Sequence, residues 1–239
     1  MSGGQARDDV HADAARRPFA GTPAAVDAQL LSAGNSQAAI HEAVLSASSP
    51  EPSLAWLDIG CGTGDVLRAV HERFAPERLV GVDLIDWLDG DLREHVEVLV
   101  GPAEELVDTL EGFDRVLMVE TIEHLPAPWT VLARAAACVK PGGRIVVSTP
   151  NVATLRHRLE LLARGHLTSF RPGNAPHMTP ALPHVIASVL AAAGLSAEAV
   201  RYAGSDVIPL TGGTTWPEPL RRRWARAGSV SVIIVGRRP

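Results

Sequence analysis

The stretch from Leu54 to Asp65, which reads LAWLDIGCGTGD, constrains the fold of this 239-residue chain more than any other. Its first half is a short apolar run, typical of a central parallel strand that is covered on both faces. Gly60, Gly62 and Gly64 follow at alternate positions, where glycine permits positive φ and close approach of a ligand to the backbone. A helix that begins near Gly64 would offer unpaired N–H groups to that ligand. The pattern predicts a nucleotide-binding turn, although an ordinary strand-to-helix turn can use the same residues.

A second apolar run ends at Asp83, where a carboxylate can accept hydrogen bonds from a ribose diol. LDIGCGTG followed by VGVDL resembles the first two motifs of the class I S-adenosylmethionine-dependent methyltransferases. In that family G-x-G-x-G, with an acidic residue two positions before the first glycine, is typical of a methyl-donor site. The resemblance implies that Asp58 supports the methionine end of the donor, that Gly60, Gly62 and Gly64 border it, and that Asp83 binds the ribose hydroxyls.

The adenine end of the donor site departs from the family pattern. The third expected strand leads into Gly101-Pro102-Ala103-Glu104. The family usually has an acidic residue just before the alanine, where it meets the adenine amino group, and Pro102 stands in that place. We therefore assign the adenine contact to the Ala103 backbone and to Glu104.

The order of apolar runs predicts an α/β fold. The resemblance, which covers residues 53–200 well, implies a Rossmann-like, seven-stranded, mostly parallel sheet with an antiparallel last strand and helices on both faces. KPGGRIVVSTPN resembles the entry and exit of the family's fifth strand, and its Pro-Gly turn is expected to separate a helix from that strand. We expect strands at 54–59, 79–83, 96–100, 115–119, 144–149, 196–202 and 230–235, and helices at 26–46, 66–74, 129–139, 153–164 and 180–193.

The chain is expected to hold one catalytic domain with additions. Residues 1–50 are interpreted as a disordered arm followed by a helical extension, because the first 21 residues are small and polar. In the resembled family such N-terminal helices often cover the donor site. Residues 51–239 form the methyltransferase domain, with substrate-side insertions at about 151–180 and 203–228. The absence of long apolar runs predicts no membrane span, and two cysteines without a disulfide framework predict a cytoplasmic protein.

An acidic segment after the fourth strand carries the candidate chemistry. Glu120, Glu123 and His124 are spaced i, i+3 and i+4, so a helix would place them on one face at the strand ends where ligands bind. Carboxylates and imidazole suit Mg²⁺, Mn²⁺ or Zn²⁺. A metal ion there could lower the pKa of an acceptor hydroxyl beside the donor methyl. The loop that contains His177 could supply a fourth ligand.

This E-x-x-E-H pattern resembles two methyltransferase branches in which it is a metal site: the O-methyltransferases of ubiquinone biosynthesis and the small-RNA 3′-terminal 2′-O-methyltransferases. Similar sequence motifs also occur in methyltransferases with no known metal, where the glutamate caps a helix and the histidine lines the substrate pocket. In that alternative, His124 or His177 is the candidate catalytic base, because an imidazole pKa of about 6.5 suits removal of a hydroxyl proton near neutrality.

The predicted reaction is transfer of the methyl group of S-adenosylmethionine to the hydroxyl of a small-molecule acceptor. One alternative is 2′-O-methylation of RNA, which the eleven arginines and four acidic residues after residue 150 favour. The absence of an appended RNA-binding module and of aromatic-basic platforms argues against a nucleic-acid partner. The other alternative is a non-catalytic donor-binding subunit, and the intact acidic segment argues against it.

Overall fold

The computed structural model describes residues 37–171 and 177–239, and a seven-stranded sheet forms its centre. The strand order is β3-β2-β1-β4-β5-β7-β6. Neighbouring strands from β3 to β5 are parallel, and β7 is antiparallel to both β5 and β6. The predicted fold class is thereby confirmed. The strands are β1 (Ala55–Ile59), β2 (Arg78–Asp83), β3 (Glu97–Val100), β4 (Phe113–Val119), β5 (Val139–Pro150), β6 (Ser196–Ala203) and β7 (Ser231–Arg237).

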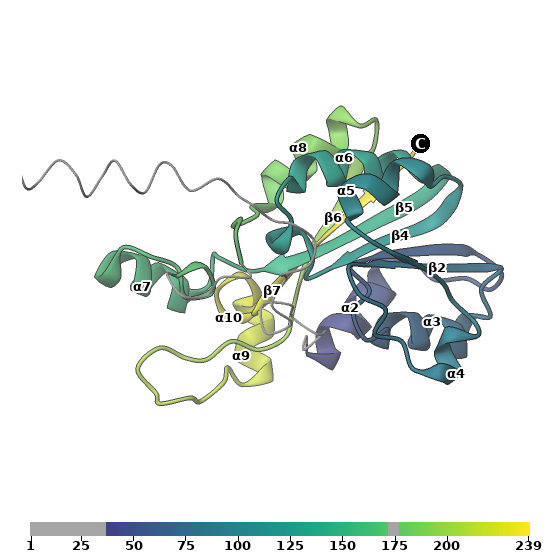
Figure 1. Cartoon of the computed structure of the whole chain (residues 1–239). Helices are drawn as coiled ribbons and strands as arrows, with labels where there is room; N and C mark the ends of the chain where they lie inside the picture. The colour runs from purple at the N-terminus through teal and green to yellow at the C-terminus, as the bar shows by residue number, and fades with distance from the viewer. Residues whose placement is uncertain (1–36, 172–176) are drawn as a thin grey trace, which may run out of the picture. The chain divides into compact units, whose positions relative to one another are not determined.

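Helices cover both faces of the sheet. Successive side chains of each strand point to opposite faces, so the apolar strands present buried side chains to both helical layers. Leu57 belongs to the core cluster under one helical layer, and its neighbour Trp56 belongs to the cluster under the other. Helices α5, α6 and α8 pack on the first face, and α2, α3 and α4 pack on the second (Figure 1). Their bounds are α2 Ala38–Ala47, α3 Asp65–Phe74, α4 Gly90–Arg93, α5 Ala103–Leu106, α6 Pro128–Ala137 and α8 Pro183–Ala192.

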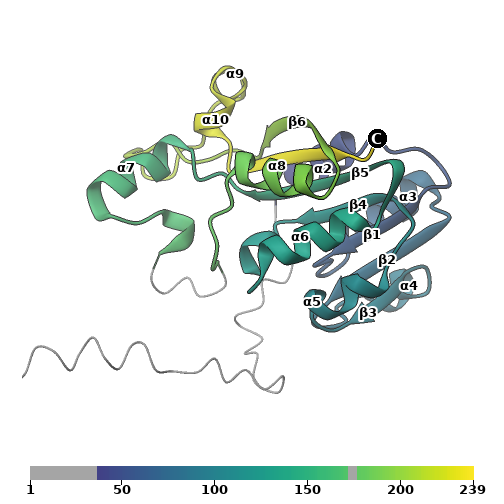
Figure 2. The ribbon, with the colours of Figure 1, turned by 90° about the horizontal axis from the view of Figure 1, so that it is seen from above.

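A third group of helices lies beyond the end of the sheet at which the parallel strands finish (Figure 2). It comprises α7 (Leu155–Arg164), α9 (Glu218–Arg223) and α10 (Ala225–Gly228). Asn151, just after β5, accounts for part of this arrangement. Its backbone N–H donates to the Val230 carbonyl (2.7 Å), and its side-chain amide donates to the Ser229 carbonyl (2.9 Å). Both segments predicted as substrate-side insertions contribute to this end of the structure.

The structure differs from the sequence predictions at β5. The predicted turn at residues 140–143 lies inside β5, which begins at Val139 and bulges: β4 pairs with it at Val139 and next at Arg144. Gly142, at φ 80°, lets the strand continue through this irregularity. The predicted helix 26–46 is described only from residue 37 onward, so the interpretation of residues 1–36 lies outside the described residues. Cys61 and Cys138 are both buried and unpaired.

Within residues 37–171 and 177–239, none of the helices has the length and apolar character needed to cross a membrane.

Candidate active site

The glycine turn between β1 and α3 is held by hydrogen bonds from its backbone N–H groups to a carbonyl and to a side chain of β2. Gly60 N–H donates to the Val82 carbonyl (2.7 Å), and Gly62 N–H donates to Asp83 Oδ2 (2.8 Å). Gly60 has φ of 76°, and a Cβ atom there would lie 2.4 Å from the Thr121 side chain. Glycine is therefore required at this position for both conformation and space. The same contact brings the predicted donor turn against the segment that follows β4.

Asp58, the penultimate residue of β1, is a buried carboxylate with one oxygen that lacks a hydrogen-bond partner among the described residues. Its side chain is 2% exposed, and Oδ1 has no hydrogen-bond partner among the described residues. Burial, and then the neighbouring charge of Asp83, raise the pKa of Asp58 to about 7. A cationic group bound beside Asp58 would offset both effects. The sulfonium and amino groups of S-adenosylmethionine are such groups.

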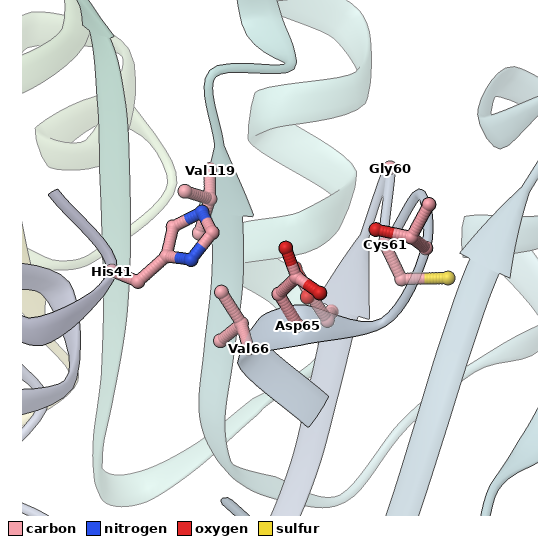
Figure 3. Close-up of a pocket in the computed structure, with 8 residues that line it drawn as sticks. His41, Gly60, Cys61, Asp65, Val66 and Val119 are labelled. Atoms are coloured by element: carbon pink, nitrogen blue, oxygen red, sulfur yellow. The ribbon is translucent and has the colours of Figure 1, made fainter. Parts of the chain in front are cut away.

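A hollow above the glycine turn is bordered on one side by His41 of α2 (Figure 3). His41 of α2 and Asp65 at the start of α3 point into it from opposite sides, and Asp58 and Val119 also contribute to its lining. Burial lowers the pKa of His41, while Asp65 acts in the opposite direction. His41 was not among the residues predicted from the sequence. Its position in a helix expected to cover the donor site was the signal that could have identified it.

The residues assigned to the adenine lie at the start of α5. Ala103 is the first residue of this helix, and Pro102 precedes it with extended backbone. The Glu104 carbonyl accepts a hydrogen bond from Arg134, which fixes α5 to α6. Glu104 Oε1 is buried and, within the described parts of the chain, has no hydrogen-bond partner. The assignment of Ala103 and Glu104 to the adenine stays a prediction.

The acidic segment after β4 does not form the expected α-helix. Glu120 has a left-handed backbone conformation, with φ of 50°, and only Ile122–His124 form a short 3-10 helix. Glu120 therefore does not share a helical face with the other two predicted ligands. Its Oε1 accepts hydrogen bonds from Ser148 (2.8 Å) and Ser231 (2.7 Å). These two hydroxyl groups orient Glu120 from β5 and β7.

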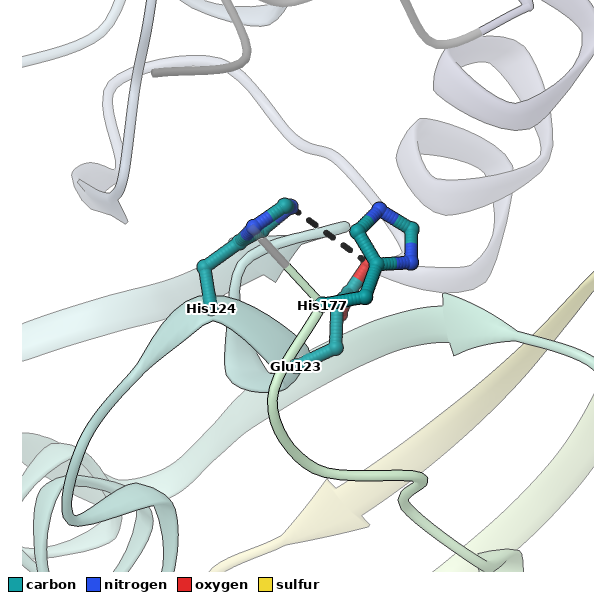
Figure 4. A group of neighbouring side chains, drawn as sticks. All are labelled: Glu123, His124 and His177. Atoms are coloured by element: carbon teal, nitrogen blue, oxygen red, sulfur yellow. Dashed lines mark ion pairs between the residues drawn. The ribbon is translucent and has the colours of Figure 1, made fainter. Parts of the chain in front are cut away.

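Glu123, His124 and His177 come together instead (Figure 4). One potential ligand atom from each residue lies within 4.8 Å of the others. His177 reaches this place because Glu123 O accepts hydrogen bonds from the backbone N–H groups of Met178 (2.8 Å) and Thr179 (3.2 Å). The two imidazole rings meet edge to face, with 4.7 Å between their centroids. The structure thus joins two predicted ligands to the histidine predicted as a fourth.

The electrostatics of this cluster favour a bound cation. Burial, and then the charge of Glu120, raise the pKa of Glu123 well above its usual value. Burial, and then His124, lower the pKa of His177 to about 4. Glu123 Oε1 and His177 Nδ1 are both buried and lack hydrogen-bond partners in the described residues. A divalent cation bound by one atom of each residue would satisfy Glu123 Oε1, and a small inward movement of the three side chains would give the usual bond lengths of about 2.0–2.2 Å.

Three hydroxyl residues of the site were not selected from the sequence. Ser148 and Ser231 bind Glu120, and Thr149 Oγ1 donates to Glu123 Oε2 (3.2 Å). Ser148 and Thr149 stand at the end of a predicted parallel strand, which is a signal that could have identified them. Ser231 begins β7, and only the antiparallel pairing of β7 with β5 brings it to this edge.

The fold and the donor turn define a class of protein: an α/β enzyme that binds a nucleotide-containing donor at the carboxyl ends of parallel strands. A family model for the methyltransferase domain matches residues 33–200, and the chain belongs to this family. It is an S-adenosylmethionine-dependent methyltransferase.

Individual relatives agree with this assignment. The ubiquinone biosynthesis O-methyltransferase of Rhizobium etli (strain CIAT 652) is 30% identical over 203 residues, which cover 80% of this chain and 76% of that protein. An S-adenosylmethionine-dependent methyltransferase from Archaeoglobus fulgidus has a similar fold, with a TM-score of 0.54, 20% identity and coverage of 82% and 93% of the two chains. The N-methyltransferase NodS from Bradyrhizobium japonicum WM9, solved with S-adenosyl-L-homocysteine, gives a TM-score of 0.55, 16% identity and coverage of 83% and 85%.

Proposed function

We propose that this enzyme methylates a hydroxyl oxygen of a small-molecule acceptor, and that Glu123, His124 and His177 hold a divalent cation at the acceptor site. The observation that carries the proposal is the cluster of Glu123, His124 and His177, in which one potential ligand atom of each residue lies within 4.8 Å of the others and the buried Glu123 Oε1 has no hydrogen-bond partner among the described residues. Mg²⁺, Mn²⁺ and Zn²⁺ all suit such ligands. The similarity to an O-methyltransferase of ubiquinone biosynthesis supports oxygen as the methylated atom.

Different residues serve the donor and the acceptor. Asp58 faces the cationic part of the donor, and Asp83, beside the glycine turn, binds the ribose hydroxyls. His41 donates a hydrogen bond to the methionine carboxylate from the opposite wall of the hollow. Gly60 and Thr121 bring the two sites into contact, so the acceptor oxygen can be aligned with the donor methyl. A bound cation would supply Lewis acidity that lowers the pKa of the acceptor hydroxyl.

A histidine base is the alternative to the metal. The pKa of His177, about 4, makes this side chain a poor proton acceptor near neutral pH but keeps its ring available as a neutral ligand. His124 remains the alternative base. Chelation separates the two mechanisms, because a base without a metal ion needs no cation.

The basic surface gives little support to an RNA acceptor. Arg221 and Arg222 both form ion pairs with Glu218, at 2.6 and 2.8 Å. Their charge is thereby partly neutralised, which weakens the case for a phosphate-binding patch. We expect no RNA affinity tighter than ~10 μM at physiological salt.

The test is methyl transfer from radiolabelled S-adenosylmethionine to a panel of phenols, catechols and hydroxy acids that includes ubiquinone precursors. We expect transfer to at least one hydroxyl compound, loss of transfer with chelator, and recovery with Mg²⁺, Mn²⁺ or Zn²⁺. Full activity of thoroughly demetallated enzyme would contradict the proposed role of a metal ion. Exclusive transfer to nitrogen compounds or RNA would contradict the proposal that the acceptor is a small-molecule hydroxyl.

A further inference from the structure

The side chain of Gln37, the residue just before α2, binds a distant part of the chain. Its backbone carbonyl accepts a hydrogen bond from the Ile40 N–H (2.7 Å), so Gln37 stands at the N-cap position of the helix. A side chain at this position usually caps its own helix, but within the described residues that of Gln37 makes no such bond. Its Oε1 instead accepts a hydrogen bond from the Ser205 backbone N–H (3.3 Å). Gln37 therefore connects two segments that are 168 residues apart.

Gly204 allows these two segments to approach each other. It directly follows β6 and has φ of 67°, a backbone conformation that favours glycine. A Cβ atom there would lie 2.7 Å from Gln37 Oε1 and closer still to Val230 Cγ2. Any other residue at this position would therefore press on the start of α2 from one side and on the residue before β7 from the other.

Ser205 stands at the root of the segment 203–228, which is predicted to be a substrate-side insertion. Its hydroxyl donates to the Trp216 carbonyl (3.1 Å), and the Trp216 N–H donates to the carbonyl of Asp206 (3.1 Å). The Asp206 N–H in turn donates to the Gly228 carbonyl (2.9 Å). These bonds close the segment on itself, so the N–H that Gln37 binds belongs to a fixed framework.

Helix α2 extends from this root toward the donor hollow. Gln37, Ala38 and Ala39 are exposed, so the first turn of the helix has little packing of its own. His41 lies about one turn after Gln37 and points into the hollow above the glycine turn (Figure 3). The place where the helix begins therefore affects where His41 stands.

We propose that Gln37 is a positioning residue: its hydrogen bond with Ser205 fixes the first turn of α2 and thereby holds His41 over the glycine turn. The donor hollow then depends on the segment 203–228, which lies outside both the glycine motif and the cluster of Glu123, His124 and His177. The effect on donor binding rests on the contact between His41 and the donor in the proposed function, whereas the link between α2 and Ser205 does not.

A matched pair of variants at Gln37 tests this role. Gln37→Met keeps the length of the side chain but removes the acceptor, whereas Gln37→Glu keeps an oxygen that can accept from Ser205. By calorimetry with S-adenosylmethionine, Gln37→Met should bind about threefold more weakly than wild type, within the range for one hydrogen bond. Gln37→Glu should restore the wild-type affinity.

A double-mutant cycle with His41 distinguishes positioning from a general structural effect. If Gln37 acts through His41, Gln37→Met should weaken donor binding in the wild-type background and cause no further loss in His41→Ala. A general loss of structure would weaken binding equally in both backgrounds, so an equal loss would overturn the proposal. Wild-type affinity in Gln37→Met would also overturn it, if His41→Ala itself binds more weakly.

Two glycines test the link from the other side. Gly204→Ala should weaken donor binding, because the added Cβ displaces Gln37. Gly212→Ala is the control: Gly212 also has positive φ, 71°, but a Cβ there meets no atom of the described residues within 4 Å. Both variants therefore carry backbone strain, and only Gly204→Ala should affect the donor. Equal donor affinities of the two variants would contradict the link.

Amide hydrogen exchange at Ser205, followed by NMR in the absence of donor, tests the link independently of donor binding. Exchange at Ser205 should be faster in Gln37→Met than in wild type or Gln37→Glu, and equal rates in all three would overturn the link. Wild-type donor affinity in His41→Ala would instead overturn the His41 contact of the proposed function, and the exchange rates would still decide whether Gln37 joins α2 to Ser205.

Discussion

The proposed donor site and the proposed acceptor site of this enzyme are built in different ways. The donor site uses neighbouring residues of one β-α-β unit: Asp58, the glycine turn and Asp83, with the hydrogen bond from Gly62 to Asp83 joining its two ends. The acceptor site draws Glu123 from the segment after β4, Thr149 from β5 and His177 from the chain before α8. A local motif can therefore define the first site, whereas the second exists only after the sheet has formed. The two sites should respond independently to substitution.

The strongest contrast is expected from Glu123→Gln. It removes a buried ligand charge, so methyl transfer should fall by more than about 100-fold, beyond the 10–100-fold typical of residues that only orient a ligand. Donor affinity should remain at the wild-type value. Initial rates with labelled donor and calorimetry with S-adenosylmethionine measure the two effects.

Glu105→Gln, which changes an exposed acid on α5, is the matched control and should leave both quantities unchanged. A Glu123→Gln enzyme with wild-type activity would show that the acceptor site works without a cation.

The reverse pattern is expected from Asp83→Ala. If Asp83 binds the ribose as proposed, loss of its carboxylate should weaken S-adenosylmethionine binding by about 1.5–3 kcal/mol, the scale for hydrogen bonds to a charged group. Cation affinity should not change. Calorimetry with each ligand decides this, with Asp86→Ala as the control, because Asp86 is a surface residue paired with Arg93 at 2.8 Å. Unchanged donor affinity in a folded Asp83→Ala variant would contradict this assignment and make Asp86 the next candidate for the ribose contact.

The pH dependence of donor affinity tests the proposed role of Asp58, the buried acid beside the glycine turn. The pKa of Asp58 is about 7 in the donor-free fold, and a bound cationic donor favours the ionised form. Donor affinity should therefore fall by about tenfold for each pH unit below 7, and Asp58→Asn should abolish this dependence and bind weakly throughout. Titrations between pH 5.5 and 8 test the prediction, and a flat wild-type profile would contradict it.

The same shift affects stability. Because the folded pKa lies above the unfolded value, the stabilising contribution of Asp58 is complete at low pH and is lost as the pH rises through 7. Asp58→Asn should thus raise the melting temperature of the donor-free protein more at pH 8 than at pH 5.

The smallest effect is expected from substitution of His41. This residue lies on α2, outside the β-α-β unit, and is proposed to contact the donor. His41→Ala should weaken donor binding by about 1.5 kcal/mol, the lower end of the scale for a hydrogen bond to a charged group. Glu42→Gln, an exposed change on the same helix, is the control. Calorimetry gives both values, and equal affinities would remove His41 from the donor site.

The contrast between a local donor motif and an acceptor site assembled from distant segments explains what could be predicted from the sequence. The parallel strands and the glycine turn follow from short-range patterns of apolar residues and glycines, and the structure confirms them. The geometry of Glu120 could not be predicted, because its left-handed backbone breaks the helix that the E-x-x-E-H spacing suggests. Ser231 could not be predicted either, since its place beside Glu120 depends on the pairing of the last strand with β5.

The most direct test of the two-site account is a pair of titrations on demetallated wild-type protein, with Mn²⁺ binding followed by electron paramagnetic resonance and S-adenosylmethionine binding by calorimetry. We expect one Mn²⁺ site per chain, which Glu123→Gln and His177→Gln abolish and Asp83→Ala leaves intact, while donor affinity is the same with and without Mn²⁺. Absence of a Mn²⁺ site in wild type, or a site that survives loss of Glu123 and His177, would contradict it.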